Sequence, residues 1–406
     1  MRLDIPGTPH LTYCTNIHPG ESWPEVRANL ERYTLAVKAR LAPERPFGVG
    51  LRLSARAAET LAEPGELERF QDFLRANGLY VFTINGFPYG RFHGEPVKER
   101  VYLPDWLDEA RLAYTNRLAD LLAALLPEGG ELEGTISTVP GAFRARVAGA
   151  AEAEAMAELL LRHAAHLFRL KERTGRSVVL ALEPEPWCYL ETVEEAIRFF
   201  REHLHSPGAV ERFSALTGLG RGAAEEFLRG HLGVCLDACH MAVAYEEPEA
   251  AVRALRDAGI RIAKAQITAG LQVRFGEGDA GDAERLEALR SFADPVYLHQ
   301  VVACGEGLER HLDLPEALTR WGAEGRLPRE TRIHFHVPIA WKELGPFEST
   351  QDYVRSFLAL LRREQVCGHL EEETYTWDVL PEEYRREGIV EALAGELRWV
   401  LDQLQS

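Results

Sequence analysis

Short apolar runs alternate with amphipathic stretches along almost the whole chain of 406 residues. Val178–Leu182 is one such run, and its aliphatic, partly β-branched composition is typical of a strand buried on both faces of a parallel sheet. In the stretches between runs, residues of one face recur three and four positions apart, as at Leu160, His163 and Leu167, which is typical of helices that cover such a sheet. This order predicts an α/β fold built on parallel strands.

The number of runs points to a particular α/β fold. Eight strand–helix units close into a barrel, whereas a doubly wound sheet often carries a glycine-rich phosphate loop after its first strand. No such loop follows the first run, and the surplus run lies between Thr268 and Glu348. We therefore predict a (β/α)8 TIM barrel with an insertion before the last strand, including a local hairpin at Val296–Ala303. The candidate strands are His10–Thr15, Phe47–Leu53, Leu79–Ile84, Leu132–Ser137, Val178–Leu182, Leu232–Leu236, Ile260–Ile267, Ile333–Val337 and His369–Thr374.

No low-complexity linker and no repeat of fixed period divides the sequence, which favours one elaborated domain over residues 1–406. Residues from about 201 to 230 are predicted to form a helical decoration of it, and those from about 268 to 348 the insertion. The predicted helices are Trp23–Leu41, Leu67–Asn77, Leu107–Leu126, Glu152–Thr174, Val193–His203, Ala223–Arg229, Pro248–Asp257 and Thr350–Arg363.

Charge and composition limit the environment and the partners of the chain. Its 46 Lys+Arg and 63 Asp+Glu give a net charge of −17, which is repelled by phosphate and excludes nucleic acid or an anionic membrane as ligand. The N-terminus lacks a basic region followed by an apolar one, and no stretch approaches the roughly 18 apolar residues that span a bilayer. The six cysteines show no disulfide-framework spacing. We therefore expect a cytoplasmic protein.

Polar residues interrupt the apolar runs at their C-terminal ends. Glu183 directly follows Val178–Leu182, and Asp237 ends the run from 232. A carboxylate there is partly desolvated, so we expect it to be paired, protonated or bound to a cation. The alternatives are that Glu183 caps a helix or pairs with an arginine, and that Asp237 is a helix N-cap. His240 follows Asp237 at i+3, a spacing that returns the imidazole to the same rim.

Two later segments carry further candidates. His334 and His336 are two positions apart, so on a strand both face the same side, although either is alternatively a satisfied core histidine. Glu371 and Glu373 likewise share a face, and the Thr-Tyr-Thr-Trp that follows favours burial of Glu373. Because barrel strand ends meet at one rim, these groups are expected to lie near Glu183.

Carboxylates with histidine or glutamine between them form the mixed oxygen and nitrogen shell favoured by Mn²⁺, Mg²⁺ or Co²⁺ and tolerated by Zn²⁺. Such a divalent metal, bound to vicinal oxygens of a sugar, polarises a carbonyl so that a neighbouring carboxylate moves a proton between adjacent carbons. Cys235 and Cys239 flank Asp237, which leaves zinc as an alternative, although the spacing is not a standard structural zinc pattern.

The motifs Leu-Glu183-Pro and Leu-Asp237-Ala-Cys-His240, with a last strand ending at Glu373, resemble the xylose isomerase-like barrel superfamily of sugar isomerases, epimerases and endonuclease IV. A second resemblance, to the metabolite traffic protein EboE family, implies a role in export or maturation of secondary metabolites and association with a prenyltransferase-like membrane protein. It is carried by His10-Leu-Thr-Tyr-Cys-Thr-Asn-Ile-His-Pro-Gly20, Gly50-Leu-Arg-Leu-Ser54, Asn85-Gly-Phe-Pro-Tyr-Gly90, Phe92-His-Gly94 and Glu373-Thr-Tyr-Thr-Trp377.

The superfamily resemblance implies roles for individual residues. Glu183 and Glu373 match the paired carboxylates that bind metal and move the proton, and His240 matches a contact to substrate oxygen. The seventh-strand position is Gln266, where the epimerases have histidine, so either Gln266 coordinates the metal or a histidine of the insertion replaces it. The metal ligands expected on this basis are Glu183, Asp237, Gln266, His336 and Glu373, with Glu183, Glu373 and His240 as catalytic groups.

Substrate contacts are expected from four residues of the rim. Arg52 ends the second strand and is placed to meet a phosphate or carboxylate, with an internal ion pair to a rim glutamate as the alternative. Trp377 belongs to a set of aromatic residues near the strand ends that are candidates for a floor or lid. Asn85 and His334 are the other two residues expected to contact the substrate.

We therefore predict a divalent-metal-dependent isomerase or epimerase that acts on a small, sugar-like metabolite. The first alternative is a non-catalytic protein that binds or carries a metabolite on the same scaffold, which Gln266 favours. The second is a metal-dependent hydrolase, in which the same ligands activate water. The endonuclease branch is discounted because the chain is acidic and its strand ends carry too few histidines for three zinc ions.

Overall fold

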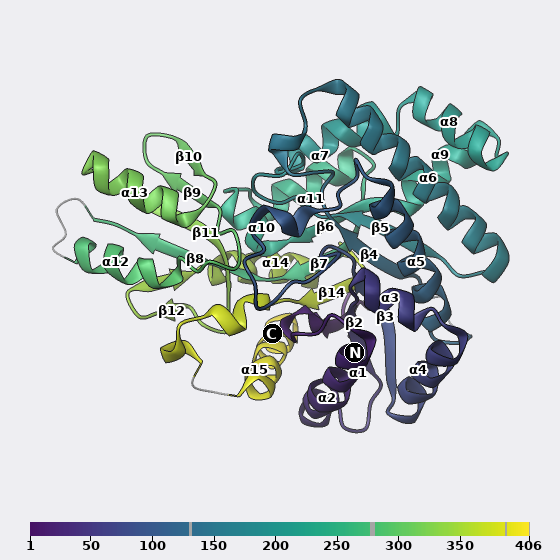
Figure 1. Cartoon of the computed structure of the whole chain (residues 1–406), viewed down its shortest axis with the longest axis horizontal. Coiled ribbons are helices and arrows are strands. Elements are labelled where there is room, and N and C mark those ends of the chain that lie inside the picture. The colour runs from purple at the N-terminus through teal and green to yellow at the C-terminus, as the bar shows by residue number, and fades with distance from the viewer. Residues whose placement is uncertain (130–131, 277–280, 386–387, 406) are drawn as a thin grey trace.

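The structure is a computed structural model, and it describes residues 1–129, 132–276, 281–385 and 388–405. Within these ranges, eight parallel strands form one sheet in the order β1-β14-β7-β6-β5-β4-β3-β2, with helices around it (Figure 1). This arrangement confirms the predicted (β/α)8 barrel. The strands are β1 (His10–Tyr13), β2 (Phe47–Arg52), β3 (Leu79–Asn85), β4 (Gly134–Thr138), β5 (Val178–Leu182), β6 (Leu232–Asp237), β7 (Arg261–Ile267) and β14 (His369–Glu372).

The barrel closes between β1 and β2 through a side chain. The hydroxyl of Thr12 donates to the Gly48 carbonyl at 2.8 Å and accepts the Gly50 amide at 3.1 Å, and a single bridge joins Cys14 to Gly50. Glycine is required at position 50, because a Cβ there would collide with Glu371 Oε1 and the Tyr13 carbonyl. β1 and β2 are thus joined by a hydroxyl where the other neighbouring strands are joined by peptide ladders.

The helices lie mostly where the spacing of apolar residues predicts them. Trp23–Leu41, predicted as one helix, is divided by a π-helical turn at Leu30–Thr34, and α15 lies outside the predicted helices and packs against α14 and α2. The helices around the barrel are α1 (Trp23–Asn29), α2 (Leu35–Leu41), α3 (Ala55–Leu61), α4 (Pro64–Ala76), α5 (Glu109–Leu125), α6 (Ala150–Thr174), α7 (Val193–Phe199), α8 (Pro207–Thr217), α9 (Arg221–His231), α10 (Ala238–Val243), α11 (Pro248–Asp257), α14 (Gln351–Arg363) and α15 (Ile389–Gln405). No helix in the described ranges is both long and apolar enough to cross a membrane.

The insertion between β7 and α14 contains a second sheet. Its strands pair antiparallel in the order β10-β9-β11-β8-β13-β12, beside the barrel in Figure 1. The surplus run of the sequence is β11. The hairpin expected at Val296–Ala303 lies further along the chain, because β9 begins only at Val301 and pairs with β10. The elements are β8 (Ala269–Arg274), α12 (Asp282–Leu289), β9 (Val301–Cys304), β10 (Leu308–His311), α13 (Leu314–Glu324), β11 (Glu330–Val337), β12 (Glu343–Leu344) and β13 (Phe347–Ser349).

Two glutamates meet in the buried contact between β14 and α15. The Thr374 hydroxyl lies 2.9 Å from Glu372 Oε1 and 3.0 Å from Glu396 Oε2. Burial, followed by the charge of Glu396, raises the pKa of Glu372 well above its usual range, and burial also raises the pKa of Glu396. The two carboxyl groups are therefore stable together only when they hold a proton.

This pair makes folding stability depend on pH. Because the folded pKa values are raised, the stabilising contribution is present below the unfolded pKa of 4.5 and is lost as the pH rises through the folded values. As the pH rises above 4.5, the free energy of unfolding of Glu396→Gln should fall less than that of the wild type. Urea unfolding at a series of pH values measures this difference. Glu391→Gln, an exposed glutamate of the same helix, is the control. Superimposable pH profiles of wild type and Glu396→Gln would contradict the shared proton.

Candidate metal centre

The ends of the barrel strands and the inserted sheet surround one pocket. Asp237 and Gln266 are register partners on β6 and β7, Gln266 pairs in turn with Glu371 on β14, and Glu183 follows β5. The pocket is small, with a cavity volume of about 50 Å³. Its lining is Asn16, Asn85, Phe87, Pro88, Phe92, Lys98, Val101, Tyr102, Glu183, Glu185, His240, Tyr297, Leu298, His334, Glu373 and Tyr375.

Asp237 has one oxygen occupied and one free. Its Oδ1 accepts the His240 amide at 2.9 Å, which caps α10, and the Thr268 hydroxyl at 2.7 Å. Among the residues that the structure describes, its Oδ2 is buried without a hydrogen-bond partner, as is Oε2 of Glu183. The N-cap expected as an alternative for Asp237 is therefore present, and it leaves a second carboxylate oxygen available for a cation.

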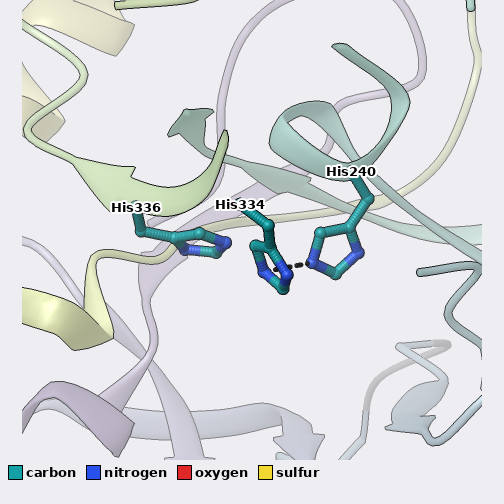
Figure 2. Close-up of side chains that lie close together, drawn as sticks. All are labelled: His240, His334 and His336. Atoms are coloured by element: carbon teal, nitrogen blue, oxygen red, sulfur yellow. Dashed lines mark hydrogen bonds between the residues drawn. The ribbon is translucent and has the colours of Figure 1, made fainter. Parts of the chain in front are cut away.

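The three histidines turn the same ring nitrogen towards one another. Nδ1 of His240 lies 3.0 Å from the Pro184 carbonyl, and Nδ1 of His336 lies 3.1 Å from the Glu373 carbonyl. Nδ1 of His334 lies 2.8 Å from Oε1 of Gln300. Because carbonyl oxygens only accept, each Nδ1 carries the ring hydrogen and each Nε2 keeps a lone pair. Figure 2 shows the three imidazoles gathered together, with a dashed line between His240 and His334.

Burial keeps these imidazoles neutral. It lowers the pKa of His240 to about 3 and that of His336 to about 4. Burial, together with the other imidazoles, lowers the pKa of His334 well below its usual value. A neutral imidazole whose Nδ1–H is held by an oxygen is the form in which histidine binds metal ions.

The pKa values of the carboxyl groups in the pocket are raised, whereas those of the imidazoles are lowered. Burial, and then the charges of Asp237 and Glu371, raise the pKa of Glu373 to about 8, although its Oε1 accepts both the Asn16 amide at 2.6 Å and the Asn85 amide at 2.8 Å. Burial and neighbouring carboxylates also raise the pKa of Glu183 well above its usual range. The raised pKa values mean that the ionised carboxylates are not balanced by enough positive charge nearby. A divalent cation would supply that charge.

One buried cation lies beneath the centre. Nζ of Lys264 on β7 is 2.5 Å from Oε2 of Glu371 and 3.2 Å from the Ser137 hydroxyl, and Lys264 and Glu371 are inaccessible to solvent. Burial opposes the charge on Lys264, but Glu371 beside it raises the pKa of the ammonium group. Lys264 also lowers the pKa values of Glu183 and Glu373, so it partly balances the acidic centre from below.

The geometry fits a divalent cation. The buried orphan atoms Oε2 of Glu183, Oδ2 of Asp237 and Nε2 of His336 are all ligand types for such an ion. Among the described residues, the sets whose ligand atoms all lie within 4.8 Å of one another are Glu183, Asp237 and His240; His240, His334 and His336; and Asp237, Cys239 and His336.

Three of the expected site residues are placed otherwise. Gln266 is at the level of Asp237, but its Oε1 accepts the Cys235 thiol at 3.1 Å. Arg52 lies outside the lining, because its guanidinium is held by Glu21 and two backbone carbonyls, the internal ion pair of the alternative. The indole of Trp377 packs in the hydrophobic core and also lies outside the lining. The other expected residues lie in or directly beside the pocket.

Several residues of the pocket escaped the sequence analysis. Tyr102 donates to Glu185 Oε1 at 2.8 Å and accepts the Gln300 amide at 2.8 Å, and Tyr297 comes from the insertion. Tyr102 ends a short 3-10 helix at Lys98–Tyr102 and Tyr297 lies in a loop, and neither segment has a hydrophobic period that the sequence reveals. Only Glu185, two positions after Glu183, carried a signal, because i and i+2 of an extended segment share a face.

No protein-family model and no curated protein matches the chain. Among solved structures, it is similar to a D-allulose 3-epimerase from Methylomonas sp. in complex with D-allulose, at 13% identity over 99% of this chain and 100% of that one, with a TM-score of 0.47. It is similar to the IOLI protein with a bound zinc atom, at 13% identity over 98% of each chain and a TM-score of 0.47.

A xylose isomerase-like TIM barrel protein from Mycobacterium smegmatis in complex with magnesium is also similar, at 11% identity over 99% of this chain and 98% of that one, with a TM-score of 0.45. Each TM-score is below 0.5. The class of fold, a (β/α)8 barrel, therefore rests on the strand order and pairing of this chain itself.

Proposed function

We propose that this protein is a divalent-metal-dependent isomerase or epimerase of a small, oxygen-rich, sugar-like metabolite. The observation that carries the proposal is that ligand atoms of Glu183, Asp237 and His240 lie within 4.8 Å of one another beside the ends of β5 and β6, and that Glu183 Oε2 and Asp237 Oδ2 are buried without a hydrogen-bond partner among the described residues. A bound divalent metal supplies Lewis acidity that polarises a substrate carbonyl.

The residues of the chain supply the proton transfer. Oε1 of Glu373 is fixed by two amide donors, which leaves Oε2 to take or give a proton. Its pKa of about 8 suits exchange near neutral pH. Glu183 follows β5, separated from β14 by β6 and β7, so the two carboxyl groups approach a substrate from different sides. His240 and His334 line the pocket and are placed to contact hydroxyl groups.

The EboE resemblance supports a finer proposal, that the metabolite belongs to secondary metabolism and that the protein associates with a prenyltransferase-like membrane protein.

One observation favours the non-catalytic alternative, a metabolite carrier. An aromatic cluster of Phe92, Tyr297 and Tyr375, whose ring centroids lie 5.1–5.3 Å apart, forms part of the pocket lining. Aromatic rings hold a ligand by packing, which a carrier requires and a proton transfer does not.

Proton exchange in D₂O separates these functions. We expect the Mn²⁺-loaded or Co²⁺-loaded protein to wash deuterium from solvent into the carbon beside the carbonyl of a ketose or ketose phosphate, as followed by NMR. Glu373→Gln should lose at least about 100-fold of this exchange, the usual contribution of a general base. It should keep its metal, because Glu373, although expected as a ligand from the sequence, belongs to none of the ligand sets found among the described residues. Glu246→Gln, a partly buried carboxyl group outside the pocket lining, is the matched control.

Other outcomes overturn the proposal. Tight binding of a metabolite without deuterium exchange supports the carrier, and release of a hydrolysis product supports the hydrolase. Equal exchange by Glu373→Gln and the wild type removes Glu373 from the proton transfer.

A further inference from the structure

Two neutral imidazoles face each other with the same kind of atom. Nε2 of His240 lies 3.0 Å from Nε2 of His334. The hydrogens of both rings are on Nδ1, held by the Pro184 carbonyl and by Oε1 of Gln300. Two lone pairs cannot form a hydrogen bond with each other, and both residues are at least 96% buried.

The orientation of Gln300 is itself fixed by its surroundings. Its Nε2 donates to the Pro186 carbonyl at 3.2 Å and to the Tyr102 hydroxyl at 2.8 Å, so Oε1 must face His334. The Tyr375 hydroxyl lies 3.5 Å from His334 Nε2, which is long for a hydrogen bond. The lone pairs of His240 and His334 therefore have no adequate donor among the side chains that contact them.

A third imidazole completes the group. The ring centroid of His336 lies 5.3 Å from that of His334 and 5.9 Å from that of His240, and its buried Nε2 has no partner (Figure 2). In all three residues an oxygen acceptor holds Nδ1–H, which is the arrangement that orients histidine ligands around a metal ion. At a bond length of about 2.1 Å, two Nε2 atoms bound to one ion lie about 3.0 Å apart at an octahedral angle of 90° and about 3.4 Å apart at the tetrahedral angle.

The three imidazoles and the two carboxylates do not share one ion. Ligands of one ion lie at most about 4.2 Å apart, twice a bond length of about 2.1 Å. Among the described residues, ligand atoms of Glu183, Asp237 and His240 lie within 4.8 Å of one another, as do those of His240, His334 and His336 and those of Asp237, Cys239 and His336, but no set holds all three imidazoles and both carboxylates. Nδ1 of His240 lies 3.9 Å from Oε1 of Glu183 but is bonded to the Pro184 carbonyl, and Nε2 lies nearer to Nε2 of His334, at 3.0 Å, than to Oδ1 of Asp237, at 3.9 Å.

We propose that the centre has two metal positions, and that His240, His334 and His336 form a three-histidine position for a transition metal ion such as Zn²⁺, Co²⁺ or Fe²⁺. The carboxylate position at Glu183 and Asp237 takes the harder Mg²⁺ or Mn²⁺. This goes beyond the proposed function, which requires a single ion. His334 and His336 belong to β11 of the inserted sheet and His240 to α10 of the barrel, so this ion also links the insertion to the barrel.

The test measures metal content and coordination rather than activity. Protein loaded with Zn²⁺ and Mn²⁺ and then dialysed is expected to hold both ions by mass spectrometry, with a first shell of three imidazoles in zinc X-ray absorption spectra. His334→Gln should lose the zinc and keep the manganese. His163→Gln, a buried histidine of α6 that bonds to Asn116, is the matched control and should keep both.

Gln300→Leu provides a second variant if His334→Gln does not fold. It keeps all three imidazoles and removes only the acceptor of His334 Nδ1–H. Loss of such an outer partner typically lowers metal affinity about 10–100-fold, so the zinc dissociation constant should rise by that factor with manganese binding unchanged.

The outcomes distinguish this inference from the proposed function. A single ion per chain that survives His334→Gln and disappears in Asp237→Asn overturns the three-histidine position and leaves the proposed function standing. Zinc that disappears in His334→Gln, without any ion at the carboxylates, overturns the proposed metal role of Glu183 and Asp237 and upholds the three-histidine position. Unchanged zinc affinity in Gln300→Leu overturns the inference.

Discussion

Asp237→Asn is expected to bind the divalent ion of the carboxylate position at least about 100-fold more weakly than the wild type, the upper end of what loss of a mere outer-shell partner costs. The reason is local. Oδ2 of Asp237 is a buried, charged oxygen without a partner, whereas the amide would present N–H groups to the cation. Isothermal titration with Mn²⁺ measures the difference.

The fold should tolerate this substitution. Asparagine keeps an oxygen to accept the His240 amide and the Thr268 hydroxyl, so the cap of α10 is retained. Asp105→Asn, at another fully buried aspartate, one that lies outside the ligand sets and pairs with Arg146, controls for a general effect of removing a buried charge. Equal Mn²⁺ affinity of Asp237→Asn and wild type would remove Asp237 from the centre.

The largest expected loss of stability follows removal of the cation inside the barrel. Lys264→Met should lower the free energy of unfolding by about 3–5 kcal/mol, because it leaves Glu371 buried without its partner. Removing both charges in Lys264→Met/Glu371→Leu should restore most of that loss, since two apolar side chains leave no charge unpaired. Urea unfolding of the two variants measures both values.

The single variant has a second consequence for the centre. Lys264 lowers the pKa values of Glu183 and Glu373, so its removal raises both pKa values further. Exposed Lys342, which pairs with Asp352, provides the control Lys342→Met, for which no measurable change is expected. A double variant as unstable as the single one would show that packing, and not charge, is the cause.

The barrel was predictable because its signal is local. Each strand is a run of apolar residues, and each helix a period of three and four, so both are read within a short window. The second sheet was not predictable in the same way. The surplus run placed the insertion after Thr268, but β8 starts two residues after β7 ends, without a turn residue between them, so the sequence gives no sign that the chain there enters a second, antiparallel sheet.

The site was predictable where it follows strand ends. Glu183, Asp237 and His240 were placed by their position after apolar runs, and His334 and His336 by their spacing, although β11 shifts register between Ile333 and His336. The environment of a side chain was not predictable. Only the structure shows that Arg52 is held by Glu21.

The way the barrel closes sets the order in which it can be completed during synthesis. β1 pairs by a continuous ladder with β14, the last barrel strand to leave the ribosome, and meets β2 only through Thr12 and one bridge. The first barrel strand, β1, therefore has no ladder partner until residue 372 has been synthesised. The contacts between β1 and β14 join residues more than 350 positions apart, and contacts of such long sequence separation form slowly. Glu373 directly follows β14, so the acidic centre is complete only when the last barrel strand has been synthesised. Chaperone dependence during translation is the expected cost of that topology.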